Sequence, residues 1–116
     1  MSRIPYLLEA LDRAGWDAIE VELESDDWWS LKIFRAVSMW SPVGLEKYVS
    51  FEIDPQRPKD RTEANVWTVA LSRFVKATRT SDVISSYGTN HWEKALSGLI
   101  DDLQKERNEA DFRLMP

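Results

Sequence analysis

The residues best equipped for acid–base or nucleophilic chemistry lie close together in the last third of the chain. His91 is the single imidazole of the sequence, and Ser85, Ser86 and Tyr87 shortly precede it. A hydroxyl nucleophile beside an imidazole base can support covalent catalysis. Proximity in sequence is a weak indication, however, and a histidine next to Trp92 at the start of a helix is more simply a surface residue. We therefore predict no catalytic residues. A small-molecule binding protein or an enzyme with a pocket near His91 is kept as the alternative.

The composition gives little support for a metal site or a cofactor site. The sequence has no cysteine, and neither the HExxH nor the EF-hand spacing occurs, so no metal site is expected. The four glycines form neither a phosphate-binding loop nor a dinucleotide-binding motif, and no cofactor is expected. Glu24, Asp26 and Asp27 share one turn that could hold Mg²⁺ or Ca²⁺ weakly. A solvated turn, of the kind that aspartate favours, is the simpler interpretation.

Acidic residues are concentrated near the start of the chain. The net charge is −5, and eight of the 20 acidic residues lie within the first 30 positions, together with only two of the 15 basic residues. A candidate binding face for a basic partner follows from this concentration, and it comprises Glu20, Glu22, Glu24, Asp26 and Asp27. The alternative role is structural, because charges on an edge strand discourage edge-to-edge aggregation.

The same charge balance argues against nucleic acid as the main partner, since such binding depends on neutralising phosphates with a basic surface. The basic region 57–79 keeps nucleic-acid binding as a weaker alternative. The longest uncharged runs are about ten residues, half of the roughly 20 that a membrane-spanning helix needs, so no membrane association is expected. Without cysteines or a signal-peptide core, the chain is expected in the cytoplasm.

The spacing of apolar residues predicts a helix near each end of the chain. Ile4, Leu7 and Leu11 recur at intervals of three or four, and Gly15 follows at the position where helices commonly stop. A second helix is predicted from Asn90 to about Asn108, with Trp92, Leu96, Leu99 and Leu103 on one face.

Alternation of apolar and polar residues predicts four strands between these helices. In the first strand Ile19, Val21 and Leu23 point inward, between glutamates. Three more strands are predicted over 28–40, 47–54 and 66–75, and 80–88 is predicted to be a loop with one helical turn. Consecutive strands favour an antiparallel meander, whose register brings Glu20 opposite Lys32. The prediction is one α+β domain over residues 1–116, in two layers and in the order α-β-β-β-β-α. Its helices are expected chiefly on the sheet face that carries Leu23, Trp29, Val49 and Trp67.

A second sheet face is predicted to be unusually aromatic. By parity, the face opposite the inward set carries Trp28, Phe34, Trp40, Tyr48 and Phe74. A solvated face is normally polar, so part of this face should be covered. A terminal helix is the favoured cover, with a second copy of the chain or a bound partner as alternatives. Aromatic side chains are enriched in the centres of protein interfaces, which suits the last two.

We therefore predict a non-catalytic, protein-binding or regulatory domain, with chaperone-like activity as one form of it. The partner would be another protein or a second copy of the chain. The order of elements is broadly similar to that of small acidic bacterial domains that act as secretion chaperones or regulators and are often dimeric. This similarity concerns element order alone, and such a fold hosts many functions.

Overall fold

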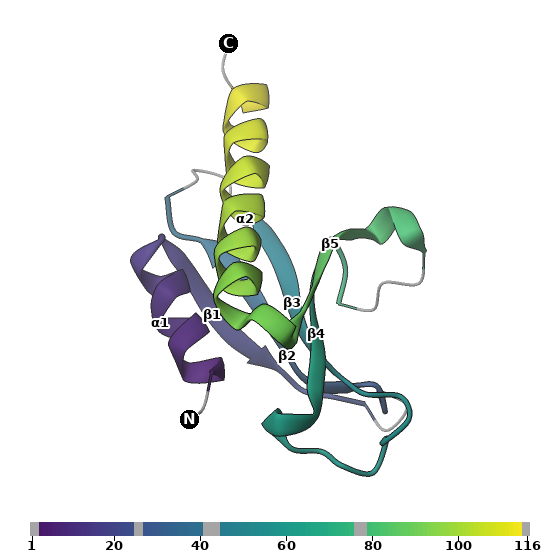
Figure 1. Ribbon diagram of the computed structural model, residues 1–116. Coiled ribbons are helices and arrows are strands. Elements are labelled where there is room, and N and C mark those ends of the chain that lie inside the picture. Colours follow the sequence, from purple (N-terminus) through teal and green to yellow (C-terminus); the bar gives the residue numbers. More distant parts are fainter. Residues whose placement is uncertain (1–2, 25–26, 41–44, 76–78, 115–116) are drawn as a thin grey trace.

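The computed structural model describes residues 3–24, 27–40, 45–75 and 79–114, and the side chains as far as residue 110. It is an α+β structure with one antiparallel sheet (Figure 1). The predicted α+β class, the antiparallel sheet and the C-terminal helix are confirmed. In chain order the helices and strands are α1 (Ile4–Arg13), β1 (Trp16–Val21), β2 (Ser30–Ser38), β3 (Glu46–Ile53), β4 (Val66–Ser72), β5 (Val83–Gly88) and α2 (Trp92–Leu114). Each strand pairs with the next, in the order β1-β2-β3-β4-β5.

Both helices lie on the same face of the sheet, which we call the helix-covered face (Figure 1). Leu7 and Leu11 of α1 and Leu99 and Leu103 of α2 are completely buried. They pack in one core cluster with sheet residues Trp16, Phe34, Ala36, Val49, Phe51, Val66, Val69 and Leu71. Truncating such a leucine to alanine typically costs about 2–5 kcal/mol, so this single layer of contacts carries much of the stability.

Helix α1 is capped from a distant part of the chain. Oε1 of Glu63, in the short 3-10 turn Glu63–Asn65, accepts hydrogen bonds from the backbone N–H groups of Arg3 and Ile4, the latter at 2.8 Å. A carboxylate here also interacts favourably with the positive end of the helix dipole. The helix stops at Gly15, as predicted, where φ is 85° and a side chain would be strained.

The sheet has five strands, so the prediction of four is wrong. The 3-10 turn Thr80–Asp82 supplies the helical turn expected in 80–88, but β5 follows it immediately. Val69 and Ala70 of β4 pair with Tyr87 and Ser86 of β5. This strand is short and lacks the apolar alternation that identifies strands in a sequence, and α2 packs against it.

The inward faces predicted for the first two strands are also wrong. Phe34 of β2 pairs with Val49 of β3 and lies in the core cluster with it, so Phe34 points toward the helices. Because Val21 pairs with Ile33 and Ile19 with Arg35, the apolar residues of β1 face away from the helices.

The ion pair expected between Glu20 and Lys32 is confirmed. Lys32 Nζ lies 3.3 Å from Glu20 Oε1. Glu20 itself pairs with Phe34 in the ladder, so its contact with Lys32 is diagonal rather than directly across.

A buried arginine joins the helix layer to the sheet. Arg107 of α2 is 2% exposed, and its Nη1 and Nη2 donate to the carbonyl oxygens of Ala14 and Gly15, each at 3.0 Å. Its Nε donates to Ser38 Oγ at 3.0 Å. The guanidinium lies 4.4 Å from the ring centroids of both Trp16 and Trp40, so it is stacked as well as hydrogen-bonded.

Candidate binding face of the sheet

The face of the sheet that the helices leave uncovered is the candidate site, and we call it the helix-free face. The ladder pairings assign to it Asp17, Ile19 and Val21 from β1, Ile33, Arg35 and Val37 from β2, Glu46, Tyr48, Ser50 and Glu52 from β3, and Thr68, Ala70 and Ser72 from β4. Both helices lie on the opposite face from these residues, so in the described part of the chain neither helix covers them.

A hollow of about 310 Å³ opens on this face. Its lining includes Ile19 and Val21 from β1, Arg35 from β2 and Tyr48 from β3. Val75, which follows β4, closes one side. Ile19 is 43% exposed and Val75 38% exposed, so the rim offers apolar surface to solvent or to a partner.

The charges of this face are mainly negative. Arg35 is the one cation among the strand residues assigned to it above, against the carboxylates of Asp17, Glu46 and Glu52. Arg35 is half-exposed, with its Nε 3.7 Å from Glu46 Oε2. Partial burial raises the pKa of Glu52 above its ordinary value.

The five residues of the predicted aromatic face do not share one surface. Tyr48 lies on the helix-free face, whereas Phe34 is in the core, edge-on to Phe51 at a ring distance of 5.9 Å. The placement of Phe34 opposite the inward set is thus wrong, because Phe34 pairs with the core residue Val49. Trp40 stacks on Arg107 on the helix side, and Phe74, 54% exposed, follows the end of β4. Trp28, the fifth member, is described next.

Three exposed tryptophans lie instead at one end of the sheet. Trp28 and Trp29 immediately precede β2, are 50% and 37% exposed, and meet edge to face at 5.9 Å. Trp67 is 50% exposed at the irregularity near the start of β4. Trp29 and Trp67 had been placed on the inward set by parity. Their exposure could be recognised only with knowledge of where the strand pairing shifts.

Only some residues of the predicted acidic face are exposed to solvent. Glu20, Glu22 and Glu24 are exposed, but Asp27 is 5% exposed and its Oδ2 accepts the backbone N–H of Glu24 at 3.0 Å. Asp27 therefore shapes the turn before β2. Asp26 lies outside the described residues.

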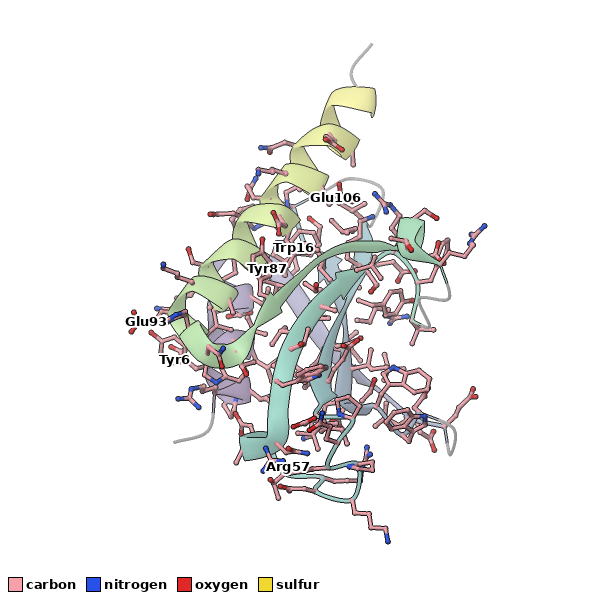
Figure 2. The ribbon with its side chains drawn as sticks, turned by 45° about the vertical axis from the view of Figure 1, so that its right-hand side comes forward. Tyr6, Trp16, Arg57, Tyr87, Glu93 and Glu106 are labelled. Atoms are coloured by element: carbon pink, nitrogen blue, oxygen red, sulfur yellow. The ribbon has the colours of Figure 1, made fainter. Side chains whose placement is uncertain are left out.

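The residues around His91 separate into two places. His91 is exposed in the 3-10 turn Thr89–His91 and lines a hollow of about 470 Å³ together with Arg3, Asn90 and Trp92. Tyr87 points instead toward α2, where its hydroxyl donates to Asp102 Oδ2 (Figure 2).

This environment makes Tyr87 a poor nucleophile. The hydrogen bond to Asp102 raises the pKa of Tyr87, and burial raises it further. The hydroxyl therefore keeps its proton at neutral pH. Ser85 pairs with Leu71 and is partly buried, whereas Ser86 is exposed opposite Ala70. Tyr87, Ser85 and Ser86 are not among the residues that line the hollow beside His91.

Four arginines of the basic region 57–79 have partners within the molecule. Arg57 Nε lies 3.7 Å from Asp54, and Arg79 Nη2 lies 3.4 Å from Asp82. Arg61 donates to backbone carbonyls, and Arg73 lies 3.9 Å from Glu106. A contiguous basic surface for phosphates does not emerge from these four arginines.

A second groove of about 470 Å³ lies between α1 and the covered side of β2, with Leu8, Leu31 and Phe34 in its lining. The charged groups at its edge already have partners: Lys32 is paired with Glu20, and Glu63 caps α1. In the described part of the chain, no three histidine, aspartate or glutamate side chains gather as a metal site would require. Neither described helix has the length and apolar character needed to cross a membrane.

Comparison with protein-family models, with curated proteins and with solved structures found no match for the chain.

Proposed function

We propose that the protein is a non-catalytic protein-binding domain that docks a basic partner protein on the helix-free face of its sheet. The observation that carries this proposal is the hollow on that face, where Ile19 and Val75 leave apolar surface exposed around Tyr48. Flat or shallow apolar surfaces rimmed by polar residues are typical of protein interfaces rather than of enzyme active sites.

Charge favours a basic protein over a second copy of the chain. The net charge is −5, and the described strand residues assigned above to the helix-free face include Asp17, Glu46 and Glu52 but only one cation, Arg35. Exposed Glu22 adds to this charge just past the end of β1. Two copies meeting through this face would bring like charges together, which costs free energy and slows association. Lysine and arginine side chains of a partner would instead be attracted.

Peptide selection tests this proposal with a defined probe. From a random displayed library, we expect enrichment of peptides that combine lysine or arginine with apolar residues. Replacing Ile19 by serine should weaken their binding roughly tenfold, the effect of losing about 1.4 kcal/mol of apolar contact. The control is Tyr6→Ser, which removes an exposed aromatic side chain from α1 on the helix side (Figure 2). Binding that is insensitive to Ile19→Ser, or enrichment of acidic peptides, would overturn the proposal.

The mass in solution tests whether a second copy of the chain, rather than a basic partner, occupies the helix-free face. Light scattering over a concentration series should give the mass of a monomer, 13.5 kDa. A dimer that dissociates in the Ile19→Ser variant would assign the helix-free face to a second copy and contradict the choice of a basic partner. A dimer that persists in that variant would leave the face free for the partner.

A further inference from the structure

Glu52 of β3 is a half-buried carboxylate on the helix-free face. Within the described residues it makes no hydrogen bond or ion pair. Its burial raises its pKa, which means that the ionised form is poorly solvated in the free protein. Buried carboxylates are normally paired, so an unpaired one on a candidate binding face calls for a partner from outside.

The three exposed tryptophans stand next to the two ladder partners of Glu52 in the sequence. Glu52 pairs with Ser30 on β2 and with Thr68 on β4. Trp28 and Trp29 directly precede Ser30, and Trp67 directly precedes Thr68. Since neighbouring strands lie about 4.8 Å apart, the backbone positions of these tryptophans lie close to Glu52, on both sides of β3.

The backbone that carries two of these indoles is held in place. Arg61 donates from Nη1 to the carbonyl oxygen of Trp28 at 2.9 Å and from Nη2 to that of Ser30. The backbone N–H of Ile53 donates to the carbonyl oxygen of Trp29 at 2.8 Å. Because these contacts already hold the backbone of Trp28 and Trp29, binding costs less conformational entropy there. They also engage the Arg61 guanidinium with carbonyls rather than with Glu52.

We propose that Glu52, together with Trp28, Trp29 and Trp67, forms a binding site for a cationic side chain, the lysine or arginine of a docked protein. The carboxylate supplies a charge-assisted hydrogen bond, and the indole faces supply cation–π attraction. The inference rests on the proposed function, because the site lies on the helix-free face and would anchor the same basic partner.

A pair of small probes tests the site independently of any partner. Nα-acetyl-lysine amide carries the cation, and Nα-acetyl-norleucine amide has a matching apolar chain without it. Titration is followed by the indole N–H signals in two-dimensional NMR. The lysine probe should shift the signals of Trp28, Trp29 and Trp67 saturably, and the norleucine probe should not. Equal shifts with both probes, or shifts confined to other tryptophans, would overturn the inference.

Two charge-matched variants complete the experiment. Glu52→Gln should weaken binding of the lysine probe about tenfold or more, because it removes the carboxylate charge and keeps the shape. Glu9→Gln removes the same charge from an exposed position on α1 and should leave binding unchanged. An unchanged affinity in Glu52→Gln would refute the site.

The outcomes separate this inference from the proposed function. If selected peptides bind in an Ile19-dependent manner but with the same affinity in Glu52→Gln, the cation site is wrong and the docking face stands. If the lysine probe binds through Glu52 but no peptide depends on Ile19, the cation site stands and the docking proposal fails.

Discussion

Replacing Arg107 by alanine should destabilise the domain more than any single surface change. The guanidinium donates three hydrogen bonds of 3.0 Å, to the carbonyl oxygens of Ala14 and Gly15 and to Ser38 Oγ. These acceptors lie just after α1 and at the end of β2. The side chain of Arg107 therefore ties both of these segments to α2. Alanine would leave them without this donor in a buried place.

The expected magnitude follows from these contacts. A hydrogen bond from a charged donor contributes about 1.5 kcal/mol at the lower end of its usual range, and three amount to about 4–5 kcal/mol. Stacking of Arg107 between Trp16 and Trp40, each at 4.4 Å, adds about 1 kcal/mol. For a domain of 116 residues the total stability is roughly 6–17 kcal/mol. The variant should lose at least a quarter of it.

Urea unfolding followed by tryptophan fluorescence measures this loss. With a slope of about 2 kcal/mol per molar, the midpoint should fall by about 2 M or more. Arg107→Lys should be intermediate, because one ammonium group cannot reach acceptors placed for a planar fork. Lys105→Ala is the control, since it removes a positive charge from an exposed position of the same helix. A loss below 1 kcal/mol for Arg107→Ala, or an equal loss for Lys105→Ala, would refute the argument.

Substitutions at Gly15, Glu63 and Glu52 give distinct outcomes in thermal or urea unfolding. Gly15→Ala should cost more than 2 kcal/mol, because φ is 85° and the new Cβ would lie 2.2 Å from the Trp40 ring. Gly88→Ala is the control and should cost little, because the nearest atom to its new Cβ, the carbonyl oxygen of Trp67, lies 4.0 Å away. Glu63→Ala should cost about 1 kcal/mol through loss of the α1 cap, and Glu63→Gln less, since the amide oxygen still accepts; equal losses would contradict the capping role. The raised pKa of Glu52 means that the native state binds a proton more tightly than the unfolded state, so stability falls as the pH rises through and above about 4.5, the ordinary pKa. Glu52→Gln should therefore stabilise the free protein at neutral pH, with a gain that disappears below that range, and an unchanged pH profile would argue against a desolvated carboxylate.

Periodicity predicted those elements whose apolar faces meet the core directly. Leu7 and Leu11 in α1, and Leu99 and Leu103 in α2, point inward as their spacing of three or four indicates. In the two central strands the alternation of Val49 with Phe51 and of Val69 with Leu71 also gave the correct face. In each of these elements, burial of one regularly spaced row of apolar side chains decides which side faces the core.

The same reasoning reversed β1 and most of β2, for reasons that a sequence does not display. Alternation of Ile19 with glutamates shows that one side of a strand is apolar, and it does not say which layer covers that side. In β2 the pairing of Phe34 with Val49 puts Phe34, and not Ile33 or Val37, on the face that the helices cover. Strand β5 was missed because its packing depends on α2 rather than on an apolar repeat of its own.

The candidate site was predictable only in its separate parts. Tyr48 and the acidic residues Glu20 and Glu22 were identified as binding candidates from their types and positions. Glu52 was not, because nothing local distinguishes it from any other strand glutamate. Its desolvation and its tryptophan neighbours arise from pairing with strands that begin 22 residues earlier and 14 residues later, at Ser30 and Val66.

The arrangement separates stability from binding in a way that substitutions can reveal. The core and Arg107 lie on the helix-covered face, so substitutions there should lower the stability of the fold and, with it, binding. On the helix-free face, ionised Glu52 disfavours folding of the free protein at neutral pH, and a bound cation would relieve that cost. Glu52→Gln should consequently raise stability while lowering affinity for a cation, and this opposition is the signature of a binding residue rather than of a structural one.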